Sequence, residues 1–115
     1  MNLSGQCHCG NIEFEVKDDE HIVRTDCNCR ECQHATGSFE IPFVSINPSK
    51  LTFKKGKGKI FKAKAGEQCD KNGRWMFCEN CGSMLMWMED NNQFYTLLAG
   101  VLNETEIVRS LPKRQ

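Results

Sequence analysis

The sequence has no long hydrophobic run and no net charge. A helix that spans a membrane needs about 20 consecutive apolar residues, and no stretch of this 115-residue chain approaches that length. Fifteen basic side chains are balanced by fifteen acidic ones, so no overall field draws the chain to nucleic acid or to an anionic membrane. We therefore expect a soluble protein with no nucleic-acid or membrane partner.

The amino terminus has no export signal. Residues 1–5 contain neither the basic segment nor the apolar segment of a secretory signal peptide. The expected location is therefore cytoplasmic, where structural disulfides are rare. A cysteine-rich chain in that compartment favours metal ligands over disulfides.

Helical periodicity is nearly absent, and only residues 30–35 are suited to a helical turn. Apolar and polar residues alternate with a period of two around residues 12–16 and 41–46, which predicts half-buried strands. No repeat or linker interrupts the chain. We expect one all-β domain over residues 1–115, with at most one short helical turn.

Two hairpins are predicted from the turn residues. The first joins residues 51–53 to residues 60–61 through a loop rich in lysine and glycine. The second joins residues 84–88 to residues 94–99 through an acidic, asparagine-rich turn. The methionines of the second hairpin alternate with Leu85 and Trp87, which is typical of a strand that is buried on both faces.

Seven of the eight cysteines fall into three short clusters. These are Cys7 and Cys9; Cys27, Cys29 and Cys32; and Cys78 and Cys81, with Cys69 apart from all of them. Such spacings let several thiolates converge on one ion, and zinc takes four protein ligands in a structural site or three in a catalytic site. Redox dithiols and buried apolar cysteines are the alternatives.

The first and last clusters are expected to form a closed site. Cys7 and Cys9 lie two residues apart, so an extended backbone directs both sulfurs to the same side. A turn at Cys78 and Cys81 brings two more sulfurs to one ion. The site would join the N-terminal strand to the late hairpin, and its role would be structural.

The middle cluster has no obvious local fourth ligand. Three protein ligands and a vacant position are the pattern of a catalytic zinc, which acts as a Lewis acid or lowers the pKa of a bound water or thiol. A fourth protein ligand would seal the site. The candidates for that ligand are Cys69, His34, Asp26 and Glu31.

The order of the motifs resembles the glutathione-dependent formaldehyde-activating enzyme family, also called the CENP-V/GFA domain. The shared elements are Gly5-x-Cys7-x-Cys9-Gly10, Cys27-x-Cys29-x-x-Cys32, Gly37-Ser38, Phe77-Cys78-x-x-Cys81-Gly82 and Gly100-x-Leu102. Seven cysteines in this order and spacing are a specific signature, and the resemblance covers nearly the whole chain.

This resemblance implies an all-β, Mss4-like fold of antiparallel sheets with two zinc ions per chain. The structural zinc would lie on Cys7, Cys9, Cys78 and Cys81, and the second zinc on Cys27, Cys29 and Cys32, which would be the catalytic residues. The activity implied is that of a carbon–sulfur lyase, which adds formaldehyde to the thiol of glutathione to give S-hydroxymethylglutathione. A small thiol such as glutathione would then be the partner.

Two sequence features concern the substrate. Glutathione carries two carboxylates, which local cations can bind, and the candidates are Arg30, Arg74, Lys54, Lys55, Lys57 and Lys59. Family members usually have a histidine within the middle cluster, whereas this chain has Asn28, with His34 as the nearest replacement.

Two other classes of function fit the same cysteines. One is a zinc-stabilised module that binds a partner without catalysis, since a fold does not determine function. The other is a thiol redox or zinc-release sensor, in which Cys69 would join the middle cluster on oxidation.

Overall fold

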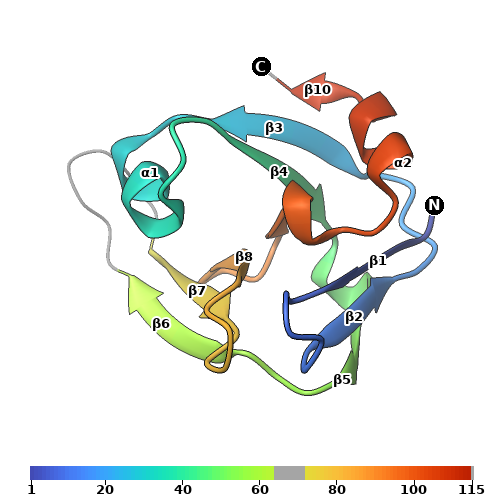
Figure 1. The fold of residues 1–115 in the computed structure, drawn as a ribbon. Coiled ribbons are helices and arrows are strands. Elements are labelled where there is room, and N and C mark those ends of the chain that lie inside the picture. Colours follow the sequence, from blue (N-terminus) through green and yellow to red (C-terminus); the bar gives the residue numbers. More distant parts are fainter. Residues whose placement is uncertain (64–71, 115) are drawn as a thin grey trace.

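The computed structural model describes residues 1–63 and 72–114, which form two β-sheets (Figure 1). The smaller sheet has the order β1 (Leu3–Gln6), β2 (Glu13–Val16) and β5 (Leu51–Lys55). The larger sheet has the order β10 (Lys113–Arg114), β3 (Val23–Cys27), β4 (Ile41–Ile46), β9 (Tyr95–Leu98), β8 (Met84–Glu89), β7 (Gly73–Phe77) and β6 (Lys59–Ala63). Neighbouring strands are antiparallel except for the β10–β3 pair. The predicted all-β class is confirmed.

The helix α1 (Arg30–Thr36) lies where a helical turn was expected. It begins after Cys29, whose sulfur accepts the backbone N–H of Cys32, and it ends at Gly37, whose φ of 78° is the left-handed conformation that favours glycine. Among the described residues, no helix is long and apolar enough to cross a membrane.

Further short helices were not expected from the sequence. They are α2 (Thr105–Ser110) and the 3₁₀ turns η1 (Pro48–Lys50) and η2 (Ala99–Val101). Val108 is the one residue of α2 that is buried, while Ile107 remains exposed. Because a single buried position produces no helical periodicity, the sequence pattern gave no signal for this element.

The main hydrophobic core lies between the two sheets. Phe14 and Val16 of the smaller sheet pack in one cluster with Val44, Leu85 and Leu97 of the larger sheet. All five side chains are at most 1% exposed. In Figure 1 the strands β1, β2 and β5 lie on one side of the molecule and α1 lies on the opposite side.

Strand β4 is buried on both faces, whereas the alternation in its sequence predicted one buried face. Val44 and Ile46 point into the core between the sheets, while Ile41 and Phe43 belong to a second cluster with Trp75. Successive side chains of a strand point to opposite faces, so the second cluster lies on the other face of the large sheet. This is the face that α1 and the middle cysteines pack against.

The predicted hairpin over residues 51–61 is wrong. Strand β5 pairs with β2 in the smaller sheet, and β6 pairs with β7 in the larger sheet. The glycine-rich segment between them crosses from one sheet to the other. Gly56 has a φ of 66° and lies against the backbone of Asn11, while Gly58 lies against Met76, so neither position has room for a side chain.

The predicted hairpin near the C-terminal end of the chain is confirmed. Strands β8 and β9 pair antiparallel, with Trp87 opposite Thr96 and Met88 opposite Tyr95. Leu85, Met86 and Met88 are buried, and Trp87 is half-buried on the face with Trp75. The strand is therefore covered on both faces, as the methionine pattern indicated.

A carboxylate joins the first strand to the last helix. Glu104 precedes α2 and accepts hydrogen bonds from the backbone N–H of Ser4 at 2.7 Å and from its hydroxyl at 2.6 Å. Both bonds involve an ionised acceptor, which makes them stronger than neutral hydrogen bonds. They connect parts of the chain that are 100 residues apart.

Replacing Glu104 with alanine should lower the free energy of unfolding by about 1–3 kcal/mol, because it leaves the partly buried N–H of Ser4 without its acceptor. The measurement is the urea midpoint of metal-loaded protein. Glu106→Ala is the matched control, since this side chain is exposed on α2. An equal decrease in the free energy of unfolding in the two variants would show that the hydrogen bonds of Glu104 do not stabilise the fold.

Candidate metal centres and reaction cavity

The first and last cysteine clusters converge on one point. The sulfurs of Cys7, Cys9, Cys78 and Cys81 all lie within 4.8 Å of one another. The Cys9 sulfur is 3.6 Å from that of Cys7 and 3.7 Å from that of Cys78. Four sulfurs bound tetrahedrally to one zinc at ~2.3 Å would lie about 3.8 Å apart, so the spacing fits such an ion.

Two tight turns bring these sulfurs together. Cys78 follows the end of β7, and Gly82 closes the turn by donating its N–H to the Cys78 carbonyl at 2.7 Å. Gly82 has a φ of 80°, a conformation that other residues rarely adopt. The N–H of His8 donates to the Ser83 hydroxyl, which attaches the first turn to the second, and the His8 side chain is exposed.

The donor groups of this cluster favour a bound cation. Hydrogen bonds from the Ser83 hydroxyl and N–H lower the pKa of Cys81 to about 5. Cys7 and Cys78 are 1% and 2% exposed, which leaves little water to solvate further negative charge. A divalent, thiol-binding cation such as zinc would neutralise the four converging donors.

The middle cluster is also assembled. The sulfurs of Cys27, Cys29 and Cys32 lie within 4.8 Å of one another, and those of Cys27 and Cys32 are 3.4 Å apart. Cys27 ends β3, Cys29 caps α1, and Cys32 lies in the first turn of that helix. All three are half-buried.

A cation is needed if this trio is to be fully deprotonated. Burial raises the pKa of Cys32 well above its usual range, and the neighbouring sulfurs of Cys29 and Cys27 raise it further. Three thiolates so close together repel one another. The set therefore fits a thiol-binding metal held by three protein ligands.

Among the described residues, no fourth ligand joins the trio. The side chain of His34 is exposed, and its Nε2 lies 2.9 Å from the guanidinium of Arg30. Asp26 pairs instead with Lys113 at 2.9 Å and with Arg24 at 3.1 Å. Glu31 lies beside the trio without entering it, and Cys69 falls outside the described residues.

The trio opens into a cavity of about 500 Å³ on the α1 side of the large sheet. Its floor is a row of side chains across four paired strands, in which Ser45 faces Thr96, Thr96 faces Trp87, and Trp87 faces Trp75. Thr25 lies two residues before Cys27 on β3 and projects from the same face. The four-cysteine cluster contributes no sulfur to this cavity.

Aromatic and acidic side chains make up much of the cavity lining. Trp75 and Trp87 lie with ring centroids 5.0 Å apart, and Phe43 lies 6.4 Å from Trp75. Phe94 forms part of the rim and is 47% exposed. Among the described residues, Glu31 and Glu89 contribute carboxylates to the lining.

Sequence reasoning missed most of this lining. Of the lining residues, the sequence pointed only to the three cysteines and to Glu31 as a possible fourth ligand. Thr25 could have been predicted as a lining residue, because side chains two positions apart on a strand share a face and Cys27 lies two residues after it. Ser45, Thr96 and Glu89 had no such signal, because their proximity depends on which strands pair.

None of the cations considered for glutathione lines this cavity. Arg30 bonds to Gln33, and Arg74 bonds to Asn92 and faces Asp90 at 3.6 Å. In the lysine-rich segment, Lys54 pairs with Glu15 and Lys59 with Glu79, each at 3.8 Å, and Lys55 and Lys57 are exposed. These lysines are remote because the segment crosses between the sheets rather than forming the predicted hairpin.

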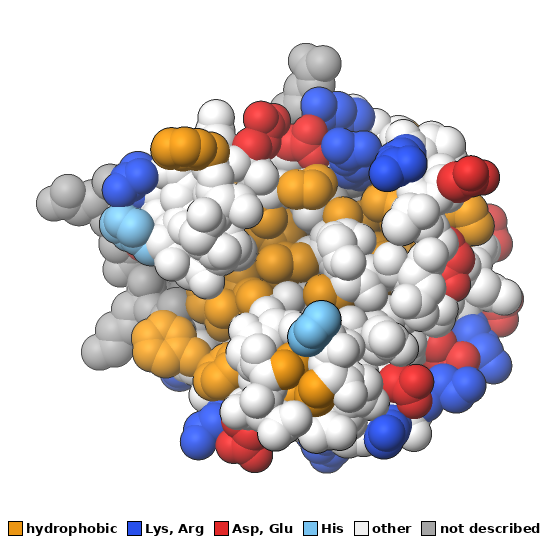
Figure 2. All heavy atoms as spheres, in the orientation of Figure 1, with side chains coloured by type: hydrophobic (Ala, Val, Ile, Leu, Met, Phe, Trp, Pro, Cys, Tyr) orange, Lys and Arg blue, Asp and Glu red, His pale blue; other side chains and the backbone are white. Residues whose placement is uncertain are grey.

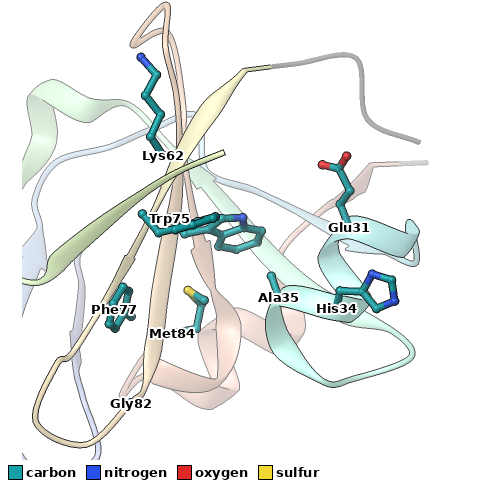
Figure 3. A pocket seen from close by; sticks show the side chains of 9 residues that line it. Glu31, His34, Ala35, Lys62, Trp75, Phe77, Gly82 and Met84 are labelled. Atoms are coloured by element: carbon teal, nitrogen blue, oxygen red, sulfur yellow. The ribbon is translucent and has the colours of Figure 1, made fainter. Parts of the chain in front are cut away.

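A second cavity of about 780 Å³ lies between α1 and strands β6 and β7. Hydrophobic side chains gather in the hollow on this face of the molecule (Figure 2). Figure 3 shows Trp75, Met84 and Ala35 around its apolar centre, while His34 and Lys62 extend away from it. Trp75 and Glu31 line both cavities.

The fold and the two cysteine clusters define an all-β protein with two candidate metal centres. The chain belongs to the family described as glutathione-dependent formaldehyde-activating enzyme, whose family model matches residues 2–113. This confirms the family resemblance of the sequence motifs.

A solved structure of a Rhodobacter sphaeroides protein, a structural genomics target, has the same fold. It superposes with a TM-score of 0.64 at 20% sequence identity, over 96% of this chain and 99% of that one. Among curated proteins no sequence matches significantly.

The geometry of the two clusters predicts about two zinc ions per chain. Inductively coupled plasma mass spectrometry on protein purified without chelator measures the count directly. One equivalent or none would contradict two zinc sites.

Proposed function

We propose that this protein is a zinc-dependent carbon–sulfur lyase that joins a small aldehyde, such as formaldehyde, to a small thiol. The observation that carries the proposal is the difference between the two clusters. Four cysteines form one compact set with two buried members, whereas three half-buried cysteines open into a cavity. Family membership supports the same chemistry.

In this proposal Cys7, Cys9, Cys78 and Cys81 hold a structural zinc. Their positions follow from the turns after β1 and β7, so the site ties the smaller sheet to the larger one. Closing a loop of about seventy residues restricts the unfolded chain, although the gain grows only slowly with loop length. Metal-free protein should therefore be at least partly unfolded.

Cys27, Cys29 and Cys32 would hold the second zinc, and no fourth ligand among the described residues joins them. Bound there, zinc supplies Lewis-acid stabilisation of a thiolate or of a carbonyl oxygen. A substrate sulfur held by the trio would lie in the cavity that Thr25, Ser45 and Thr96 also line. The aromatic side chains of the lining would limit water around the reacting atoms.

The reaction balances without an oxidant. The thiol releases its proton, and its sulfur attacks the carbonyl carbon to form a C–S bond. The carbonyl π bond breaks, and the oxygen takes up a proton to give an S-hydroxymethyl product. The reverse sequence is the lyase direction. Holding both reactants in one cavity would supply much of the acceleration.

Formaldehyde and thiols combine slowly without a catalyst, so a test of activity must measure an increase in rate. Exchange spectroscopy by NMR measures this rate. Zinc-loaded protein should raise the rate of interconversion between free and S-hydroxymethyl thiol by at least about tenfold, as expected for proximity and Lewis-acid catalysis. If the protein did not accelerate the exchange and thiols did not protect the middle cysteines, the lyase proposal would be refuted and a binding module favoured.

The two clusters should respond differently to substitution. Cys78→Ser should unfold the domain, because it removes a ligand that joins the sheets. Cys29→Ser should remove one zinc equivalent and the activity while leaving the fold, as circular dichroism and metal analysis would show. Collapse of similar severity in both variants would contradict this division of roles.

A further inference from the structure

We infer that the thiol accepted by this protein carries an apolar substituent, an alkyl chain or an aryl ring, which binds in the second cavity between α1 and strands β6 and β7. The inference rests on the proposed thiol site at Cys27, Cys29 and Cys32 and specifies its substrate class. The cavity beside these cysteines would hold the reacting atoms, and the second cavity would hold the rest of the thiol.

The two cavities adjoin each other. Trp75 and Glu31 line both of them. On α1, Cys32 of the trio and Ala35 of the second cavity are three residues apart, and side chains at this spacing lie on the same face of a helix, with Cβ atoms about 5–6 Å apart. Both side chains pack against the cluster that contains Trp75. A substituent on a sulfur bound at the trio therefore reaches the second cavity within about one helical turn.

A row of aromatic side chains leads from one cavity to the other. Trp87 lies opposite Trp75 on β8 and β7, and Trp75 lies opposite Phe61 on β7 and β6. Side chains that lie opposite each other on antiparallel strands share a face of the sheet and contact one another. Trp87 lines the cavity beside the trio, Phe61 lines the second cavity, and Trp75 lines both. The row gives an apolar substituent one continuous surface to pack against.

The centre of the second cavity is apolar. Trp75, Met84 and Ala35 surround it, while Lys62 extends away from it (Figure 3) and lies 3.8 Å from Asp90. Its volume of about 780 Å³ and its lining are those of a small-molecule site. An alkyl or aryl group is stabilised by leaving water for such a lining, whereas a carboxylate of glutathione would lose its hydration there.

Phe61 and Ile60 provide a matched pair of substitutions. Both are large apolar residues of the edge strand β6, and they are 60% and 45% exposed. Because they are adjacent on a strand, their side chains project from opposite faces. Phe61 lines the second cavity and Ile60 does not. Serine at either position removes exposed apolar surface from the same strand, but Phe61→Ser alone of the two changes the cavity.

The test is a calorimetric titration of zinc-loaded protein with ethanethiol, butane-1-thiol, hexane-1-thiol, 2-phenylethanethiol and glutathione. Each is titrated into the wild type, Phe61→Ser, Ala35→Phe and the control Ile60→Ser. Phe61→Ser removes part of the apolar lining, and Ala35→Phe fills the cavity from α1. Zinc content and urea midpoint verify that the variants fold. Because the same two thiols are compared across proteins, the difference in their thiol pKa values cancels.

In the wild type we expect the Kd to fall by about two- to fourfold for each methylene added to the alkyl chain, as burial of a CH₂ group predicts. The ratio of the ethanethiol Kd to the hexane-1-thiol Kd should fall by at least about threefold in Phe61→Ser and about tenfold in Ala35→Phe, and stay unchanged in Ile60→Ser. An equal ratio in all four proteins, or tighter wild-type binding of glutathione than of hexane-1-thiol, would overturn the inference alone.

Two further outcomes separate this inference from the proposed function. Absence of binding by every thiol would overturn the proposed thiol site, and the inference with it. A dimeric wild type together with a monomeric Phe61→Ser variant in sedimentation velocity would assign the apolar surface to a second copy of this chain. That result would overturn the inference and leave the thiol site standing.

Discussion

The convergence of four cysteine sulfurs is the constraint on which the rest of the molecule depends. Cys7 and Cys9 continue from the smaller sheet, and Cys78 and Cys81 continue from the larger sheet. Because the sulfurs come within 4.8 Å of one another, the two sheets must meet at this edge. The core of Phe14, Val16 and their partners then fills the space between them.

This arrangement leaves the other face of the large sheet available for chemistry. Strand β4 shows the separation most clearly, since Val44 packs between the sheets while Phe43 lines the cavity beside the middle cysteines. The same face holds Trp75 and the trio of cysteines at the start of α1. Substitutions between the sheets therefore act on stability, whereas substitutions of the buried Phe43 or Trp75 act on both stability and the shape of the cavity.

The sequence was informative where the interactions are local. The spacing within each cysteine cluster, the helical turn at α1 and the hairpin of β8 and β9 depend on residues close together in the chain, and all three were predicted. The pairing of β5 and β6 depends on partners from different sheets, and the hairpin prediction failed there. The lining by Ser45, Thr96 and Glu89 was missed for the same reason, because strand order is a non-local property.

The position of Asn28 shows why one departure from the usual family pattern leaves the candidate centre intact. Asn28 is exposed, while Cys27 before it and Cys29 after it are half-buried in the trio. An intervening side chain on extended backbone points away from its two neighbours. A histidine at this position would therefore lie outside the donor set as well. Replacing it with asparagine changes the surface beside the cavity, and the three sulfurs keep their arrangement.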